Sequence, residues 1–229
     1  MADTDGHDID LPVKPFDLRQ ELGRLRNMRD VIPADITRFM DKATAELIQS
    51  KLADQVVGLG NEAPGFSLPN ATGQQVTLSQ MLTRGPVVIS FYRGVWCPFC
   101  NLEQRSLQQH LPQINERGAS LVAISGQTPD NSLSMAEKNE LTYEVLSDIG
   151  LTVASSYGLV FRLLDYLQEA YERLGHPLPM FNGPGQQKLP IPATFVIARD
   201  GIVRFAYANP DYTHRADPKD ILATLKSIA

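Results

Sequence analysis

The sequence predicts an α/β fold, with a central mixed sheet covered by helices and an N-terminal helical extension. From residue 86 onward, short apolar runs rich in β-branched residues alternate with helical segments, which indicates a sheet flanked by helix layers. Strands are expected at 86–92, 120–125, 193–198 and 202–208, and helices at about 98–115 and 217–228. The turn signal Arg199-Asp200-Gly201 separates the last two strands, so these are expected to form a hairpin.

Residues 1–57 are interpreted as an arm and a helical extension, and residues 58–229 as the main domain. Residues 1–15 carry acidic residues and two prolines, which is typical of a disordered arm. From Phe16 to about Val57, apolar residues recur at helical spacing in two stripes that Pro33 separates. Two amphipathic helices packed on the main domain explain the stripes, and a dimerisation arm is the alternative interpretation.

Turn and helix signals place the remaining elements. The segments 63–68 and 75–78 flank Asn70-Ala71-Thr72-Gly73 and predict a β-hairpin. Gly118 is expected to end the helix that follows the cysteines. The other expected elements are a helix around 131–139, a strand near 143–146, a helical stretch at about 161–174, and a Gly- and Pro-rich loop at 175–192.

The composition is that of an ordinary soluble globular protein, with 43% hydrophobic and 21% charged residues. A formal net charge of -5 argues against nucleic acid or an anionic membrane surface as the main partner. No apolar run approaches the roughly 20 residues that cross a bilayer. The first ten residues lack the basic and apolar regions of a signal peptide, so we expect a cytoplasmic protein.

The only two cysteines, Cys97 and Cys100, form a C-x-x-C pair directly after the predicted strand 86–92. Two sulfurs three residues apart at the start of a helix can close a disulfide. In the cytoplasm, such a pair more plausibly cycles between dithiol and disulfide than staples a fold. The pattern therefore predicts a redox-active dithiol.

The start of the predicted helix supplies the means to form a thiolate, the reactive form of a thiol that ordinarily titrates near ~8.5. Pro98 suits the first helical position, which places Cys97 at the cap and Cys100 in the first turn, near the positive end of the helix dipole. Arg93 offers further positive charge, and Glu103 offers a carboxylate one turn after Cys100. Arg105 is expected to point into solvent along the helix.

Other chemistries find little support in the sequence. A structural zinc site wants four ligands, whereas no third cysteine exists and His7, His110, His176 and His214 lack ligand spacing. No nucleotide-binding glycine motif is present. We therefore expect neither a metal nor another cofactor.

The run from Phe91 to Glu103, FYRGVWCPFCNLE, resembles the thioredoxin-fold peroxiredoxins of the alkyl hydroperoxide reductase / thiol-specific antioxidant family. The resemblance extends from about Gly58 to the C-terminus and includes residues 63–66 and 192–197. It implies a thioredoxin-like fold for the main domain and a thiol peroxidase activity. It also makes residues 159–190 a large insert, interpreted as a lid over the cysteine turn or a partner surface.

The peroxiredoxin pattern F-Y-P-x-x-x-T-x-x-C ends in the cysteine that attacks peroxide. Counted from Phe91, that cysteine is Cys100, while Cys97 stands where the family has Thr and Arg93 where it has Pro. The family's second active-site Arg lies three residues before the Phe of its late strand, and here that position is Pro192. The resemblance thus implies Cys100 as the attacking sulfur, without three of the groups that usually assist it.

Thioredoxins instead carry W-C-x-x-C, attack with the first cysteine, and face it with a cis-proline. Cys97 is then the attacking sulfur, and Pro192 stands where the cis-proline is expected, so the Ile191–Pro192 bond is predicted to be cis. Residues expected to shape the site are Tyr92, Arg93, Trp96, Pro98, Phe99 and Pro192. The segment 211–215 is a further candidate, through Tyr212 or Arg215.

Three functions remain open from the sequence. The first is a peroxiredoxin-like thiol peroxidase that reduces hydroperoxides through Cys97 and Cys100 and is reset by a thioredoxin- or glutathione-type reductant. The second is a thioredoxin-like thiol–disulfide oxidoreductase with a disulfide substrate. The third is a redox-sensing binding protein that signals through the N-terminal helices. A homodimer is a further candidate assembly.

Overall fold

Five strands form one mixed sheet in the order β5-β4-β3-β8-β9, which confirms the predicted central sheet. The computed structural model describes residues 16–28 and 31–228. The strands of this sheet are β3 (Val87–Phe91), β4 (Ser120–Ser125), β5 (Glu144–Ser147), β8 (Ala193–Ile197) and β9 (Val203–Ala208). β3, β4 and β5 are parallel, whereas β8 runs antiparallel to both β3 and β9. β3 therefore lies at the centre of the sheet, and its carboxyl end is surrounded by other elements.

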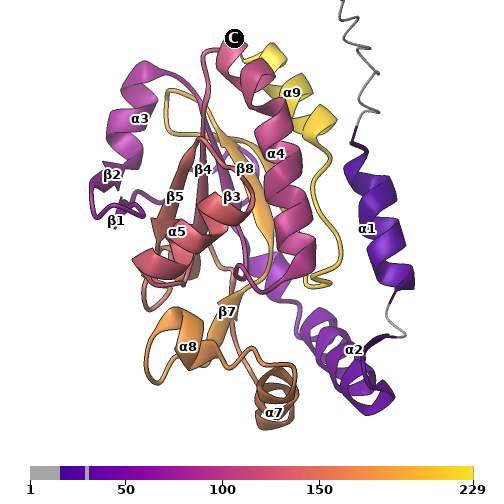
Figure 1. The fold of residues 1–229 in the computed structure, drawn as a ribbon. Helices are drawn as coiled ribbons and strands as arrows, with labels where there is room; N and C mark the ends of the chain where they lie inside the picture. Colours follow the sequence, from indigo (N-terminus) through magenta and orange to yellow (C-terminus); the bar gives the residue numbers. More distant parts are fainter. Residues whose placement is uncertain (1–15, 29–30, 229) are drawn as a thin grey trace, which may run out of the picture.

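Helices cover both faces of the sheet, as Figure 1 shows. Alternate residues of β3 point to opposite faces, so Val88 packs under one layer while Val87 and Ile89 pack under the other. The first layer holds α4 (Pro98–Glu116), α5 (Pro129–Lys138) and α9 (Pro218–Ser227). The second holds α3 (Leu78–Arg84), α6 (Thr152–Ser156) and the predicted hairpin, β1 (Ser67–Pro69) with β2 (Gln75–Thr77).

The N-terminal extension contains the two expected helices, and each packs on a different part of the main domain. α1 (Leu18–Asn27) lies against α4, and α2 (Ala34–Gln49) lies against α7 (Asp165–Arg173). An ion pair of 2.7 Å between Asp35 and Arg173 joins α2 to α7. A 3-10 helix, η2 (Leu52–Gln55), leads into the sheet domain. The predicted arm, residues 1–15, lies outside the described residues.

The segment 159–190 contains more structure than its sequence predicts. The helix expected at 161–174 is shorter, because residues 160–162 form strand β6 (Val160–Arg162) before α7 begins. The expected loop 175–192 is corrected as well, since it holds helix α8 (Leu178–Asn182) and strand β7 (Lys188–Pro190), which pairs with β6. Prolines are tolerated in a first helical turn and at strand ends, so the Pro-rich composition did not exclude these elements.

The structure describes no helix that is long and apolar enough to cross a bilayer, within residues 16–28 and 31–228.

Candidate active site

The cysteine turn lies at the carboxyl end of β3, and both of its sulfurs are buried. Cys97 is the N-cap of α4, and Cys100 lies in the first turn of that helix. Both are free thiols, 1% and 0% exposed. The Asn101 side chain holds the turn by donating to the carbonyl oxygens of Val95 at 2.8 Å and Cys97 at 3.0 Å. The sulfurs therefore sit in a fixed turn, shielded from bulk water.

Arg215 reaches Cys100 from the segment between β9 and α9. Its Nη2 donates to Cys100 Sγ at 3.1 Å, and its Nε forms an ion pair of 2.5 Å with Glu103. Its Nη1 donates to the carbonyl oxygens of Tyr212 and His214 at 2.6 and 2.7 Å. Glu103 also accepts from Thr194 at 3.4 Å. Arg215 is therefore anchored by charge and by main-chain oxygens, and one N–H remains directed at the sulfur.

Arg93 serves Cys97 in a different way. Its Nη1 lies 3.9 Å from Cys97 Sγ, and its Nη2 donates to the hydroxyl oxygen of Tyr171 in α7. The guanidinium lies over the rings of Trp96, Tyr171 and Tyr212, at 5.1, 5.7 and 4.2 Å from their centroids. Among the described residues, no carboxylate forms an ion pair with it, although it is buried. Aromatic faces attract cations, so they hold this charge in place of an acidic side chain.

The two thiols titrate as a pair in this setting. Burial alone would raise the pKa of Cys97, but the hydrogen bond from Cys100 and the charges of Arg93 and Arg215 lower it to about 5. Burial, together with the hydrogen bond and the charge of Cys97, raises the pKa of Cys100 well above its usual value. Near neutral pH the pair therefore carries one thiolate and one thiol.

Glu103 is the third ionisable group of the cluster. Burial raises its pKa to about 7, against the lowering effect of the Arg215 charge. With Glu103 ionised and one thiolate formed, two negative charges balance the guanidiniums of Arg93 and Arg215.

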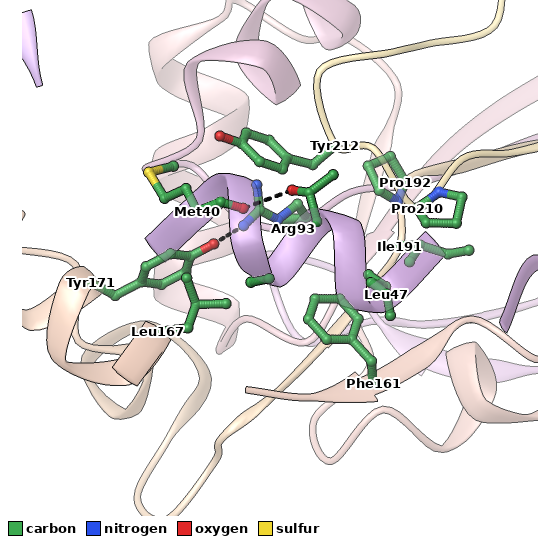
Figure 2. Close-up of a pocket in the computed structure, with 12 residues that line it drawn as sticks. Met40, Leu47, Arg93, Phe161, Leu167, Tyr171, Ile191, Pro192, Pro210 and Tyr212 are labelled. Atoms are coloured by element: carbon green, nitrogen blue, oxygen red, sulfur yellow. Dashed lines mark hydrogen bonds between the residues drawn. The ribbon is translucent and has the colours of Figure 1, made fainter. Parts of the chain in front are cut away.

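A pocket opens beside Arg93, between the extension, the insert and the sheet domain (Figure 2). The space between its walls totals about 360 Å³ with open solvent included, but only about 20 Å³ of it has room for the centre of a water molecule. Apart from Arg93, Thr44 and the tyrosines, its walls are apolar. They come from α2 (Met40, Ala43, Thr44, Leu47), β6 and α7 (Phe161, Leu167, Tyr171), and loops (Ile191, Pro192, Pro210, Tyr212).

The predicted cis bond before Pro192 is wrong, because the Ile191–Pro192 bond is trans. The Ile191 N–H donates to the Leu159 carbonyl oxygen at 2.9 Å, and the Pro192 carbonyl oxygen accepts from Asn209 at 3.3 Å. These contacts hold the extended chain on both sides of a bond whose trans form is the intrinsically favoured one. Pro192 lines the pocket through its ring, so it stays a candidate site residue.

The other expected site residues occupy different surroundings. Trp96 packs on Tyr171, His176 and Phe181 of the insert, with ring centroids 5.2, 5.9 and 6.5 Å apart. Phe99 packs edge-on against Tyr212 at 5.6 Å. Tyr92 is fully buried in the core beside the cysteines, Pro98 is exposed, and Arg105 is exposed as expected.

Sequence reasoning singled out Arg215 only as one option within 211–215, and it missed Tyr171 and the side chains of α2. The contact of Arg215 with Glu103 joins residues 112 positions apart, and that of Arg93 with Tyr171 joins residues 78 apart. The buried Glu one turn after Cys100 was a usable signal for a cationic partner. Nothing in the spacing marked Tyr171.

Comparison with known sequences identifies the family of the chain. Residues 59–206 match the model of the AhpC/TSA family. Peroxiredoxin Q, chloroplastic, of Suaeda salsa is 28% identical over 153 residues, which is 67% of this chain and 61% of that protein. A putative peroxiredoxin of Mycobacterium tuberculosis is 34% identical over 108 residues, 47% of this chain and 70% of that one. The chain thus spans about three fifths of the length of its chloroplastic relatives.

Solved structures give the fold. Peroxidoxin BcpB from Mycobacterium tuberculosis superimposes with a TM-score of 0.59 at 28% identity, covering 75% of this chain and 97% of that one. A reduced 2-Cys peroxiredoxin of Plasmodium vivax superimposes with a TM-score of 0.58 at 20% identity, covering 75% of this chain and 82% of that one, which shows the fold alone. The expected thioredoxin-like fold of the peroxiredoxins is confirmed, and the chain belongs to the AhpC/TSA family.

Proposed function

We propose that this protein is a thiol peroxidase that reduces hydroperoxides through a dithiol–disulfide cycle of Cys97 and Cys100. The observation that carries the proposal is the buried pair of thiols held between two guanidiniums, Arg93 beside Cys97 and Arg215 beside Cys100. Positive charge stabilises a thiolate and the alkoxide that leaves a broken O–O bond. Membership of the AhpC/TSA family supports the same activity.

The oxidising half of the cycle needs only the two sulfurs and the peroxide, and the reducing half needs an external thiol. One thiolate attacks a peroxide oxygen, the O–O bond breaks, and the sulfur becomes a sulfenic acid while the alkoxide takes up a proton to leave as an alcohol. The second thiol then displaces water from the sulfenic acid and closes the disulfide. A thioredoxin- or glutathione-type thiol returns the pair to its reduced state. In the family's register, Cys100 makes the first attack.

The two guanidiniums also compensate for the positions at which this chain departs from the family's sequence pattern. Pro192 stands where relatives carry an active-site Arg, and Arg93 replaces the usual Pro. Arg215 brings a guanidinium to Cys100 from another segment, and Arg93 brings one to Cys97. The site thus holds two cationic hydrogen-bond donors, although comparison with the family's sequence pattern predicted that groups assisting the sulfur would be missing.

A coupled assay tests the proposal. Reduced protein is mixed with cumene hydroperoxide, thioredoxin, thioredoxin reductase and NADPH, and the control is the double variant Cys97→Ser/Cys100→Ser. We expect NADPH consumption that depends on both peroxide and protein and that the double variant lacks. Equal consumption by the two proteins would contradict a peroxidase.

A thiol–disulfide oxidoreductase is the second candidate, and the lowered pKa of Cys97 at a helix start favours it. The burial of both sulfurs opposes a protein disulfide as substrate. Reduction of insulin disulfides faster than reduction of hydroperoxide would reverse our preference.

For the setting, we propose the cytoplasm, because its thiol pools keep such a pair reduced. A homodimer, and redox signalling through α1 and α2, remain proposals that sedimentation of the reduced and oxidised forms tests. An unchanged sedimentation coefficient in both forms, equal to that of a monomer, would count against both.

A further inference from the structure

Helix α1 contributes to the apolar cover of the two cysteines. Leu18 and Leu22 of this helix are buried, and they belong to the same hydrophobic cluster as Cys97, Phe99 and Cys100. α1 lies alongside α4 on the outside of the molecule, as Figure 1 shows. The N-terminal extension therefore takes part in shielding the dithiol from solvent.

The packing of α1 on the main domain is narrow. Beside its two buried leucines lies a polar cleft between α1, α4 and α9, in which about 850 Å³ has room for the centres of water molecules. Arg19 and Arg26 of α1, Ser106 and His110 of α4, and Lys219 of α9 are among the residues that line it. The cleft therefore separates much of α1 from the helices behind it.

Two polar contacts join α1 to the segment that carries Arg215. Arg26 Nη1 donates to the Thr213 carbonyl oxygen at 3.1 Å, and Arg19 forms an ion pair of 3.5 Å with Asp217. The Arg19 side chain is 83% exposed, so solvent screens this pair and it stabilises the packing little. The two buried leucines therefore provide most of the attachment of α1 beside the cysteines.

The neighbouring elements of the site are held more firmly. α2 is joined to α7 by an ion pair of 2.7 Å and by the hydroxyl of Tyr166, which donates to Glu46 at 2.6 Å. In the insert, β6 pairs with β7, and the Phe181 carbonyl oxygen accepts from the main-chain N–H of Thr128 at 3.0 Å. Met28, the C-cap of α1, is 61% exposed. α1 can therefore move while α2 and the insert stay in place.

Reduction of the oxidised site by a protein needs such a movement. A thiolate of the reductant attacks one sulfur of the Cys97–Cys100 disulfide, the S–S bond breaks, and a mixed disulfide forms. The second thiol of the reductant then breaks the mixed disulfide, so that two electrons and two protons pass to the site cysteines. The attacking and attacked sulfurs must touch in the first step. The cysteines are 1% and 0% exposed, so a protein dithiol cannot reach them while the cover is in place.

We propose that α1 is a movable cover of the cysteine turn, and that a protein dithiol binds the apolar surface that α1 leaves when it moves away. The proposal rests on the proposed function, whose reducing half needs an external thiol. The surface includes Phe99 and Leu102 of α4, which share the cluster of the α1 leucines. A hydroperoxide is small and needs no docking surface, so the cover acts on reduction of the disulfide rather than on oxidation of the thiols.

A matched pair of leucine variants tests the cover. Leu22→Ala removes buried contacts of α1, whereas Leu225→Ala removes an equally buried leucine from α9, in a different cluster. The disulfide is formed with diamide, and its reduction by thioredoxin is followed by alkylation and mass spectrometry of quenched samples. We expect Leu22→Ala to be reduced about tenfold faster than the wild type, because the open form is more populated, and Leu225→Ala to be reduced at the wild-type rate. No gain in Leu22→Ala, or the same gain in Leu225→Ala, would overturn the proposal.

Dithiothreitol identifies the kind of reductant that the cover controls. This small dithiol needs no docking surface, so we expect Leu22→Ala to change its rate of disulfide reduction by less than about threefold. Equal gains with dithiothreitol and with thioredoxin would contradict docking of a protein on the uncovered surface. Circular dichroism checks that both leucine variants fold.

Hydrogen exchange tests the movement in the unaltered protein, so it does not depend on the folding of a variant. We expect the hydrogen-bonded amides of α1 to exchange about tenfold faster or more than those of α2 and α4. Protection of α1 equal to that of α4 would overturn the proposal. Diamide forms the disulfide without peroxide, so these results are independent of the peroxidase assay. A protein that fails to consume hydroperoxide but shows fast exchange of α1 and the gain in Leu22→Ala would lose the proposed function and keep the cover.

Discussion

The buried ion pair beside Cys100 allows a sharp test of the site's electrostatics. Glu103 and Arg215 lie 2.5 Å apart, with side chains only 3% and 1% exposed. Arg215→Met removes the cation, its two bonds to carbonyl oxygens and its bond to Cys100, and leaves Glu103 buried without a counter-charge. Breaking a buried pair in this way lowers the free energy of unfolding by about 3–5 kcal/mol.

The chain provides a matched control for the same substitution. Arg204 and Asp200 also lie 2.5 Å apart, but their side chains are 39% and 53% exposed. Water already solvates both groups, so Arg204→Met is expected to lower the free energy of unfolding by less than about 1 kcal/mol. Urea unfolding of the reduced proteins at pH 8, followed by fluorescence, gives both values.

The pH dependence of the loss in unfolding free energy identifies the cause of that loss. The pKa of Glu103, about 7 when folded, lies above its ordinary value of 4.5, so the folded protein holds this proton more tightly than the unfolded chain. Binding of that proton contributes its full stability at pH values below the pKa of Glu103 in the unfolded chain. The contribution is lost as the pH rises through the pKa of Glu103 in the folded protein. Without Arg215 the folded pKa rises further, so Arg215→Met is expected to lose more stability at pH 8 than at pH 5.5. A loss as small as that of Arg204→Met, or one independent of pH, would refute the reasoning.

Three further predictions concern the dithiol, the insert and the extension. The pKa of Cys97, about 5 against an ordinary 9, means that the reduced protein gains stability between pH 5 and 9, by at most about 1.4 kcal/mol per pH unit, and loses it as the pH falls. Urea unfolding should show that Cys97→Ser lacks this gain, and an unchanged slope would contradict it. Tyr171→Phe removes the acceptor of Arg93 and should lower kcat/KM for cumene hydroperoxide about tenfold, whereas no change in that assay would count against Arg93 being positioned by α7. Gly158→Ala places a Cβ 2.3 Å from a main-chain oxygen of η2 at a φ of +75°, so thermal unfolding should show a loss of about 1–3 kcal/mol. Gly73→Ala, at a φ of +84° with open space around it, should lose less, and equal losses would remove the clash from the explanation.

Most of the central sheet could be predicted from the sequence because its strands are nearly continuous apolar runs. The strand at 86–92 and the helix after it followed from local signals, which also placed the cysteines at a helix start. Helix α8 and strand β7 could not be predicted in this way, because β7 exists through its pairing with β6 and its own sequence is rich in Pro and polar residues. Local sequence patterns predict an element when its own residues favour that structure. They fail when the element forms only because it pairs with a distant strand.

The residues of the candidate site also divide into those that local sequence signals identified and those that only the fold brings together. The sequence identified the two thiols, the neighbouring Arg93 and the acid at Glu103, which all lie within one strand end and one helical turn. The contact of Arg215 with Cys100 and the walls of the pocket join distant segments, so they needed the fold. The cis bond expected from the thioredoxin pattern is absent, because hydrogen bonds on both sides of the Ile191–Pro192 bond hold the chain extended with that bond trans.

A single-turnover experiment tests the dithiol cycle most directly. Trp96, the only tryptophan of the chain, is adjacent to Cys97 in sequence, and the Arg93 guanidinium lies against its ring, so we expect its fluorescence to change with the redox state of the pair. Fully reduced protein is mixed in a stopped-flow instrument with one equivalent of cumene hydroperoxide, and free thiols are then counted. We predict one fluorescence change, the loss of both thiols per peroxide, and a Cys97–Cys100 disulfide in the peptide map. Retention of both thiols, with peroxide left unconsumed, would contradict the account.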